Sequence, residues 1–130
     1  MPFSVNFYRE LDGTKPVGTF IKDLPTKLKA KVVADLHLLE EYGNLAREPL
    51  SKFLEDGIFE LRSQVGNDIV RILYFFDENK IIIATNGFIK KQEKTPTCEI
   101  ELAKARRAIY ILQKEQARSK AKRKEGKNNE

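Results

Sequence analysis

The chain has 130 residues, of which 41% are hydrophobic and 33% are charged, and its formal net charge at pH 7 is +5. This length and balance describe one globular domain and exclude a disordered chain. No apolar run approaches the ~18 residues that a membrane helix needs, and the N-terminus lacks the pattern of a secretory signal, so we expect a cytoplasmic protein.

The residues that most often carry metal or covalent chemistry are scarce. Cys98 and His37 are the only cysteine and histidine, which allows no internal disulfide and no zinc site built on those ligands alone. Neither residue has a partner close in sequence that would make it a nucleophile or a base. There is also no Gly-rich phosphate loop, so we expect no metal and no small-molecule cofactor.

The positive charge is concentrated at the C-terminus. Residues 114–130 hold seven basic and three acidic side chains, a net +4. We therefore divide the chain into a domain at residues 1–113 and a basic tail at residues 114–130. Two interpretations of the tail stay open, a solvated terminus that frays and an arm that contacts phosphates.

In chain order, the first part of the sequence predicts a strand and two helices. Residues 3–8 alternate apolar and polar side chains, as a half-buried strand does. Pro16 and Pro25 each begin a helix, because proline is favoured at the first helical position. In the second helix apolar side chains recur at spacings of three and four, and Gly43 follows where a left-handed C-terminal cap is expected.

The second part predicts three strands and a last helix. Residues 58–62, 69–76 and 80–85 are rich in β-branched and aromatic side chains and are separated by short turn sequences. Short turns join antiparallel neighbours, so these strands form a meander. Thr95 and Pro96 then predict the N-cap and the first position of a helix. The predicted order is β-α-α-β-β-β-α, an α+β domain with a two-helix hairpin and a C-terminal helix on a small, mostly antiparallel sheet.

Basic side chains gather where these three strands meet. In an antiparallel meander the end of one strand lies beside the start of the next, so Arg62 and Arg71 are close to each other. Lys90 and Lys91 leave the third strand beside the start of the strand that holds Arg71. A patch of like charges repels itself and is stabilised by a polyanion. The sequence therefore predicts an anion-binding edge of the sheet.

Other side chains near this edge leave alternatives open. Glu60 and Asp68 are close in sequence to the two arginines, so ordinary ion pairs are the alternative to anion binding. The aromatic side chains of Tyr74 and Tyr110 are candidates for stacking on nucleobases.

Three segments of the sequence resemble a known family. They are ELR at residues 60–62, VRILYFF at residues 70–76 and NGFIKKQEKTPTCEIELAKAR at residues 86–106. They resemble the phage-derived, HigB-like branch of the RelE/ParE toxin superfamily, over about residues 3–112 and most strongly at residues 58–110. The resemblance implies a RelE-like fold and the toxin of a type II toxin–antitoxin pair, neutralised by a HigA-like helix-turn-helix antitoxin.

The resemblance also implies an activity. RelE-like members cleave mRNA on the ribosome without a metal, and their basic side chains position the RNA, help activate the 2′-OH and stabilise the charge of the phosphorane. The matching catalytic positions are Arg62, Arg71, Lys90 and Lys91, and candidates for further RNA contacts are Lys94, Tyr74 and Tyr110. The general base is not identified, and a lysine whose pKa is lowered by cationic neighbours is one candidate. The alternatives are a ParE-like toxin that acts on DNA gyrase and a phage-derived binding module without catalysis.

Overall fold

The computed structural model describes residues 2–90 and 94–128, with side chains as far as residue 123. Its elements are β1 (Ser4–Phe7), α1 (Pro16–Lys22), α2 (Thr26–Tyr42), the 3-10 turn η1 (Gly43–Leu45), β2 (Ser51–Glu55), β3 (Ile58–Val65), β4 (Asp68–Asp77), β5 (Ile81–Lys90) and α3 (Thr97–Asn128). The predicted α+β class is confirmed, and the described part of the chain has one strand more than predicted.

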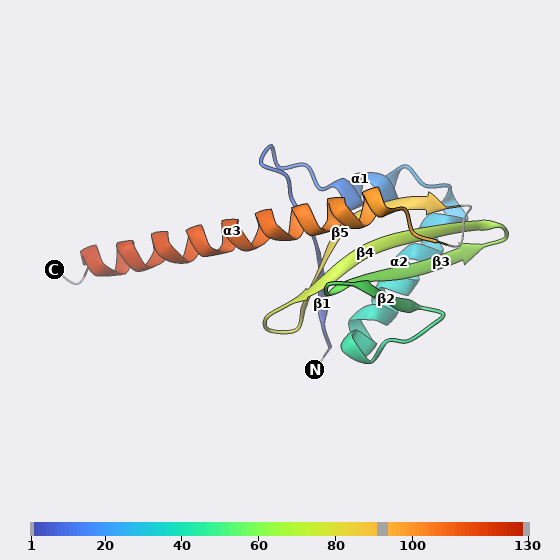
Figure 1. Ribbon diagram of the computed structural model, residues 1–130, viewed down its shortest axis with the longest axis horizontal. Helices are drawn as coiled ribbons and strands as arrows, with labels where there is room; N and C mark the ends of the chain where they lie inside the picture. The colour runs from blue at the N-terminus through green and yellow to red at the C-terminus, as the bar shows by residue number, and fades with distance from the viewer. Residues whose placement is uncertain (1, 91–93, 129–130) are drawn as a thin grey trace.

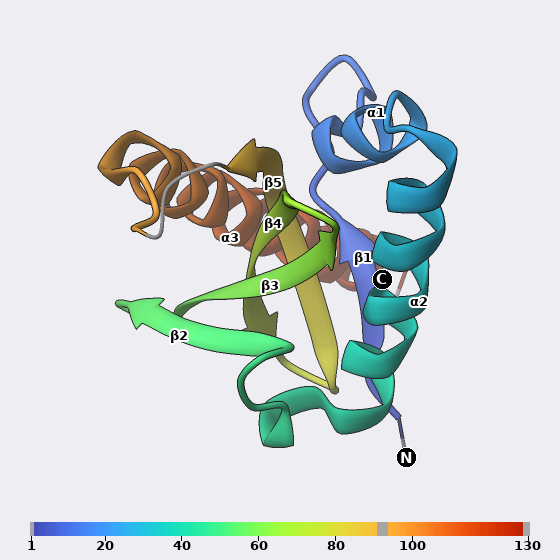
Figure 2. The same cartoon turned by 90° about the vertical axis from the view of Figure 1, so that its right-hand side faces the viewer.

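The five strands form one sheet in the order β1-β5-β4-β3-β2. The strands from β2 to β5 pair as an antiparallel meander, and β1 lies parallel to β5 at the opposite edge from β2. α1 and α2 cover one face of the sheet, and the first part of α3 covers the other (Figures 1 and 2). Each face of the sheet thus has its own apolar core. We call the face covered by α1 and α2 the α2 face, and the face covered by α3 the α3 face.

The additional strand is β2, at the edge of the sheet beside β3. Asp56 and Gly57 form the turn between the two strands, and both have positive φ, 49° and 75°. An Asp-Gly pair is a strong signal for a two-residue hairpin, because both central residues of a type I′ turn need positive φ. This dipeptide is the sequence signal from which β2 could have been predicted.

The boundaries of the first two helices follow the sequence signals. α1 begins at Pro16, and α2 begins one residue after Pro25. Gly43 follows the end of α2 with the positive φ of the predicted cap, 52°, but its ψ of −124° is not that of the left-handed helical conformation. A Cβ at Gly43 would lie 2.2 Å from the ring of Phe3, so only glycine fits between the end of this helix and the start of β1.

α3 begins at Thr97, one residue later than predicted, and runs without a break to Asn128. The hydroxyl of Thr95, predicted as the N-cap, donates a hydrogen bond to Glu60 on the sheet. The helix crosses the predicted boundary between residues 113 and 114, so as far as residue 128 the basic tail is the end of a helix. Over residues 2–90 and 94–128, no helix is both long and apolar enough to cross a membrane.

Candidate functional site

Strand register brings three of the predicted cations together. Arg62 of β3 is the Cα partner of Arg71 of β4, and Ile69 of β4 is the Cα partner of Lys90 of β5. Cα partners share a face of the sheet, and so do residues two apart in one strand. Arg62, Arg71 and Lys90 therefore lie on the α3 face. The sequence predicted them at an edge of the sheet instead. Lys91 lies outside the described residues.

A β-bulge decides the face on which Lys90 lies. The pairing of β4 with β5 shifts at Thr85, which has no partner opposite it. Ala84, before the bulge, packs in the core of the α2 face, whereas Phe88, after it, packs in the core of the α3 face. Residues four apart would share a face in a regular strand, so without the bulge Lys90 would point towards α2. The bulge therefore places Lys90 on the same face as Arg71.

A buried carboxylate lies among these cations. Glu60 is fully buried and Arg71 is 2% exposed, and Arg71 Nη1 lies 2.5 Å from Glu60 Oε1. Arg62 Nε is 3.8 Å from the same oxygen, and Thr95 donates its hydroxyl hydrogen to Oε2. The ion pair that the sequence offered as an alternative, between the arginines and Glu60, is thus present.

One carboxylate does not balance the cations around it. Lys52 on β2 is the Cα partner of Glu60, and Lys94 and Arg71 line a hollow of about 220 Å³ together with Glu60 and Lys52. We call this group the cationic cluster, and it consists of Lys52, Arg62, Arg71, Lys90 and Lys94. With Glu60 included, its formal charge is +4. Glu55 also lines the hollow, but it is paired with Lys104 at 2.6 Å. Lys52 was not predicted as a member, because its strand was not predicted.

Lys90 is poorly compensated within this cluster. Its side chain is 4% exposed, and among the described residues no hydrogen-bond acceptor reaches its Nζ. Burial lowers the pKa of Lys90, and the nearby cations, Arg71 foremost, lower it further against the opposing effect of Glu60. More of this amine is unprotonated at neutral pH than in an ordinary lysine, so it is suited to accept a proton.

The two aromatic candidates do not join the cluster. Tyr74 is three residues from Arg71 in one strand, so its side chain points to the opposite face, where it is 1% exposed. Its hydroxyl shares a hydrogen bond with Ser51, and burial raises the pKa of Tyr74 to about 12. The ring of Tyr74 therefore has no open face for a nucleobase, and this prediction does not fit the structure.

Tyr110 lies at the other end of the sheet. It donates a hydrogen bond of 2.6 Å to Asp77 Oδ2, at the last residue of β4. Asp77 is six positions from Arg71 along the strand, which corresponds to about 20 Å. Of the three candidates for RNA contacts, only Lys94 belongs to the cluster.

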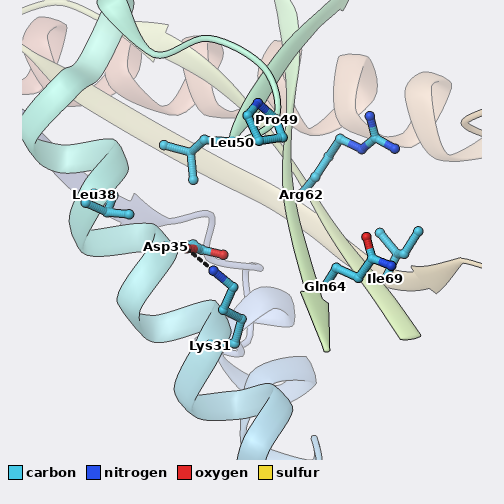
Figure 3. A pocket seen from close by; sticks show the side chains of 8 residues that line it. All are labelled: Lys31, Asp35, Leu38, Pro49, Leu50, Arg62, Gln64 and Ile69. Atoms are coloured by element: carbon cyan, nitrogen blue, oxygen red, sulfur yellow. Dashed lines mark hydrogen bonds and ion pairs between the residues drawn. The ribbon is translucent and has the colours of Figure 1, made fainter. Parts of the chain in front are cut away.

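A larger cavity, of about 460 Å³, lies between α2 and the edge of β3 (Figure 3). Its walls are formed by Lys31, Asp35, Leu38, Pro49, Leu50, Arg62, Gln64 and Ile69. Asp35 is paired with Lys31 at 3.1 Å and accepts a hydrogen bond of 2.7 Å from Ser63. Apart from Arg62, which also belongs to the cationic cluster, the charges here are balanced. The other four cations of the cluster do not line this larger cavity.

Comparison with known proteins identifies the family to which the chain belongs. The family model described as phage derived protein Gp49-like matches residues 19–108. The chain belongs to this family. The matched segment of this Gp49-like chain includes the whole cationic cluster. No curated protein sequence matches it with significant similarity.

A solved structure shares the fold of the Gp49-like chain. It is a chain in the crystal structure of an archaeal RelE–RelB complex from Pyrococcus horikoshii OT3, 18% identical, with a TM-score of 0.50. The similarity covers 72% of the Gp49-like chain and 100% of the archaeal one. The predicted RelE-like fold is thereby confirmed.

Proposed function

We propose that this Gp49-like protein is the toxin of a type II toxin–antitoxin pair and that it cleaves mRNA on the ribosome without a metal ion. The observation that carries the proposal is the cationic cluster, five cations with the buried carboxylate of Glu60 among them, beside a hollow. Such an excess of charge attracts a polyanion. Cations that the fold holds in place stabilise the charge of a phosphoryl transition state without reorganising. The Gp49-like family and the RelE-like fold support the toxin part of the proposal.

In the proposed reaction the 2′-oxygen of a ribose attacks the adjacent phosphorus, and the bond from phosphorus to the 5′-oxygen of the next nucleotide breaks. The products are a 2′,3′-cyclic phosphate and a free 5′-hydroxyl. The amine of Lys90 accepts the proton of the 2′-OH, and water on the open side of the hollow supplies a proton to the departing 5′-oxygen. The lowered pKa of Lys90 and its lack of a hydrogen-bond partner among the described residues support this role.

The other cluster residues have separate roles in the proposal. Arg62, of which 31% of the side chain is exposed, neutralises charge on the phosphorane from the open side. Arg71 acts from the wall of the hollow, and Glu60 is a positioning residue that holds its guanidinium. Lys94, which lines the hollow, contacts the RNA backbone beside the scissile phosphate.

The proposal includes a partner and a branch of the superfamily. The archaeal structure is a complex of RelE with RelB, so an antitoxin partner is expected for a protein of the same fold. We assign the protein to the HigB-like branch and its partner to the HigA-like antitoxins with a helix-turn-helix domain.

Cleavage of translated mRNA on purified ribosomes tests the activity. We expect Lys90→Met and Arg62→Ala to slow cleavage by roughly 10²–10³-fold, the loss typical of removing one stabilising group from a transition state. The control is Lys27→Ala, which removes an exposed cation of α2 and leaves the rate as in the wild type. Wild-type rates in both cluster variants would mean that the cluster is not the active site.

A DNA supercoiling assay with gyrase, run in parallel, separates the alternatives. A wild-type protein that leaves mRNA intact and inhibits gyrase would be a ParE-like toxin. A protein that does neither, and whose expression without an antitoxin does not slow growth, would be a binding module without catalysis.

A further inference from the structure

The last part of α3 extends beyond the body of the protein. Among the described residues, the ion pairs between α3 and the sheet that lie nearest the C-terminus are made by Lys114 and Arg118. Residues 119–128 continue the helix away from the sheet (Figure 1). At the rise of an α-helix they project by about 15 Å. We call residues 119–128 the arm.

An acidic turn fixes the direction in which the arm leaves the body. Asp77 accepts hydrogen bonds from Tyr110 at 2.6 Å and from Lys114 at 2.9 Å, and Glu78 accepts one from Arg118 at 2.8 Å. These contacts hold α3 over more than two turns before the arm begins. The arm also needs no helix nucleation of its own, because it extends a helix that is already formed.

The side chains of the arm carry charge and no aromatic ring. Lys120, Lys122 and Arg123 are all exposed. The sequence adds two more basic residues and one acidic residue before residue 129, and no aromatic residue follows Tyr110. Such a surface binds phosphates, but it cannot stack on bases as proteins that bind single-stranded nucleic acids do.

We propose that the arm binds the phosphate backbone of folded RNA without reading its sequence. The choice of RNA over DNA rests on the proposed function. Arg123 lies 26 residues after the start of α3, about 39 Å along the helix axis, and the cationic cluster lies at that starting end. A ligand that contacts both sites must span this distance, which a folded RNA does and a short segment in the hollow does not. The arm is a second site that adds affinity for large RNA and takes no part in cleavage.

Neutralising the arm tests the inference. The variant Lys120→Gln/Lys122→Gln/Arg123→Gln removes three charges and keeps residues of similar helix propensity. The matched control, Lys15→Gln/Lys22→Gln/Lys27→Gln, removes three exposed charges from the body and reaches the same net charge. Circular dichroism verifies that both variants are folded. The probes are a fluorescein-labelled RNA hairpin of arbitrary sequence and a DNA hairpin of the same sequence, with binding measured by fluorescence anisotropy across a salt titration.

We expect the arm variant to bind the RNA hairpin roughly 10- to 100-fold more weakly near 0.1 M salt, with a salt slope smaller by about 2–3, one for each lost phosphate contact. The control keeps the wild-type affinity and slope. Three results would each overturn the inference: unchanged affinity in the arm variant, an equal loss in both variants, or tighter binding of DNA than of RNA by the wild type.

The hairpin assay measures binding without turnover, so it is independent of the cleavage assay. If the arm variant loses affinity and the wild type does not cleave mRNA, the proposed function is wrong, but the inference that the arm binds RNA is supported. If the wild type cleaves mRNA and the arm variant binds the RNA hairpin as the wild type does, only the inference about the arm is wrong.

Discussion

The two ends of β4 both gather carboxylates and cations, but in different proportions. At its C-terminal end Asp77 and Glu78 meet Lys114 and Arg118, so the formal charges cancel. At its N-terminal end, where Asp68 begins the strand, the buried carboxylate of Glu60 meets the cluster, whose five cations outnumber the carboxylates there. The balanced end is a clamp that holds α3 against the sheet, and the unbalanced end is the site that we propose for an anion.

The two ends also differ in burial. Glu60 is fully buried, whereas 62% of the Glu78 side chain is exposed. Exposed ion pairs add little to stability because water and salt screen them. A buried carboxylate and its partner depend on each other, because either one alone would be a buried, uncompensated charge. Variants at the two ends therefore probe whether this contrast holds.

The largest effect is expected for Glu60→Ala. It leaves Arg71 buried without its carboxylate, so the free energy of unfolding falls by about 3–5 kcal/mol. Urea denaturation at pH 7 measures this loss. The control at the other end, Glu78→Ala, leaves the free energy of unfolding nearly unchanged. Equal effects of the two substitutions would mean that the ends do not differ in the way proposed.

A smaller effect is expected for Asp77→Asn, which weakens the clamp. Removing this charge lowers the free energy of unfolding by about 1–2 kcal/mol at pH 7, since Asp77 accepts hydrogen bonds from Tyr110 and Lys114.

The pH dependence of the clamp provides a check. Burial raises the pKa of Asp77, but the hydrogen bonds from Tyr110 and Lys114 outweigh burial and hold it below its ordinary value of 3.8. The contribution of Asp77 is therefore present above that value and is lost as the pH falls through the lower, folded-state pKa. We expect the difference between wild type and Asp77→Asn to shrink in strong acid, and a constant difference would contradict the assignment.

The smallest effect on stability is expected for Lys90→Met, which should stabilise the protein, whereas the substitutions above destabilise it. Removing a buried ammonium that lacks a hydrogen-bond partner among the described residues raises the free energy of unfolding at pH 7 by about 1 kcal/mol. The proposed function requires that the same variant also loses cleavage, the trade-off expected where an unfavourable buried charge serves activity. Lys94→Met, at an exposed cation, is the control for stability. A less stable Lys90→Met would show that Lys90 serves the fold.

The pKa of Lys90 makes this gain depend on pH. Because burial and neighbouring cations lower that pKa below its ordinary value of 10.5, the unfolded chain binds more protons than the folded chain between the two values. The stability of the wild type therefore rises with pH across this window. We expect the difference in the free energy of unfolding between Lys90→Met and the wild type to shrink in alkaline solution. Thermal melts at neutral and at alkaline pH measure it.

Particular residues show how far the sequence could be interpreted. Pro16 marks the start of α1 through a local backbone preference, which acts without tertiary contacts, whereas Gly43 is also required by its close approach to Phe3. The pairing of Arg62 with Arg71 follows from a short turn between two strands. The strand that holds Lys52 was missed, because the turn before β3 was not recognised.

The sequence by itself determined all the elements but β2, their order, and that Arg62, Arg71 and Lys90 lie on neighbouring strands, because these depend on local preferences and on short connections. Only the tertiary structure decided the face and the burial of each side chain. The bulge at Thr85 moves Lys90 onto the α3 face, and Glu60 meets Thr95 across 35 residues of sequence. Contacts between such distant residues set the solvation and the partners of a charge, and these determine whether a cation is part of a clamp or of a site.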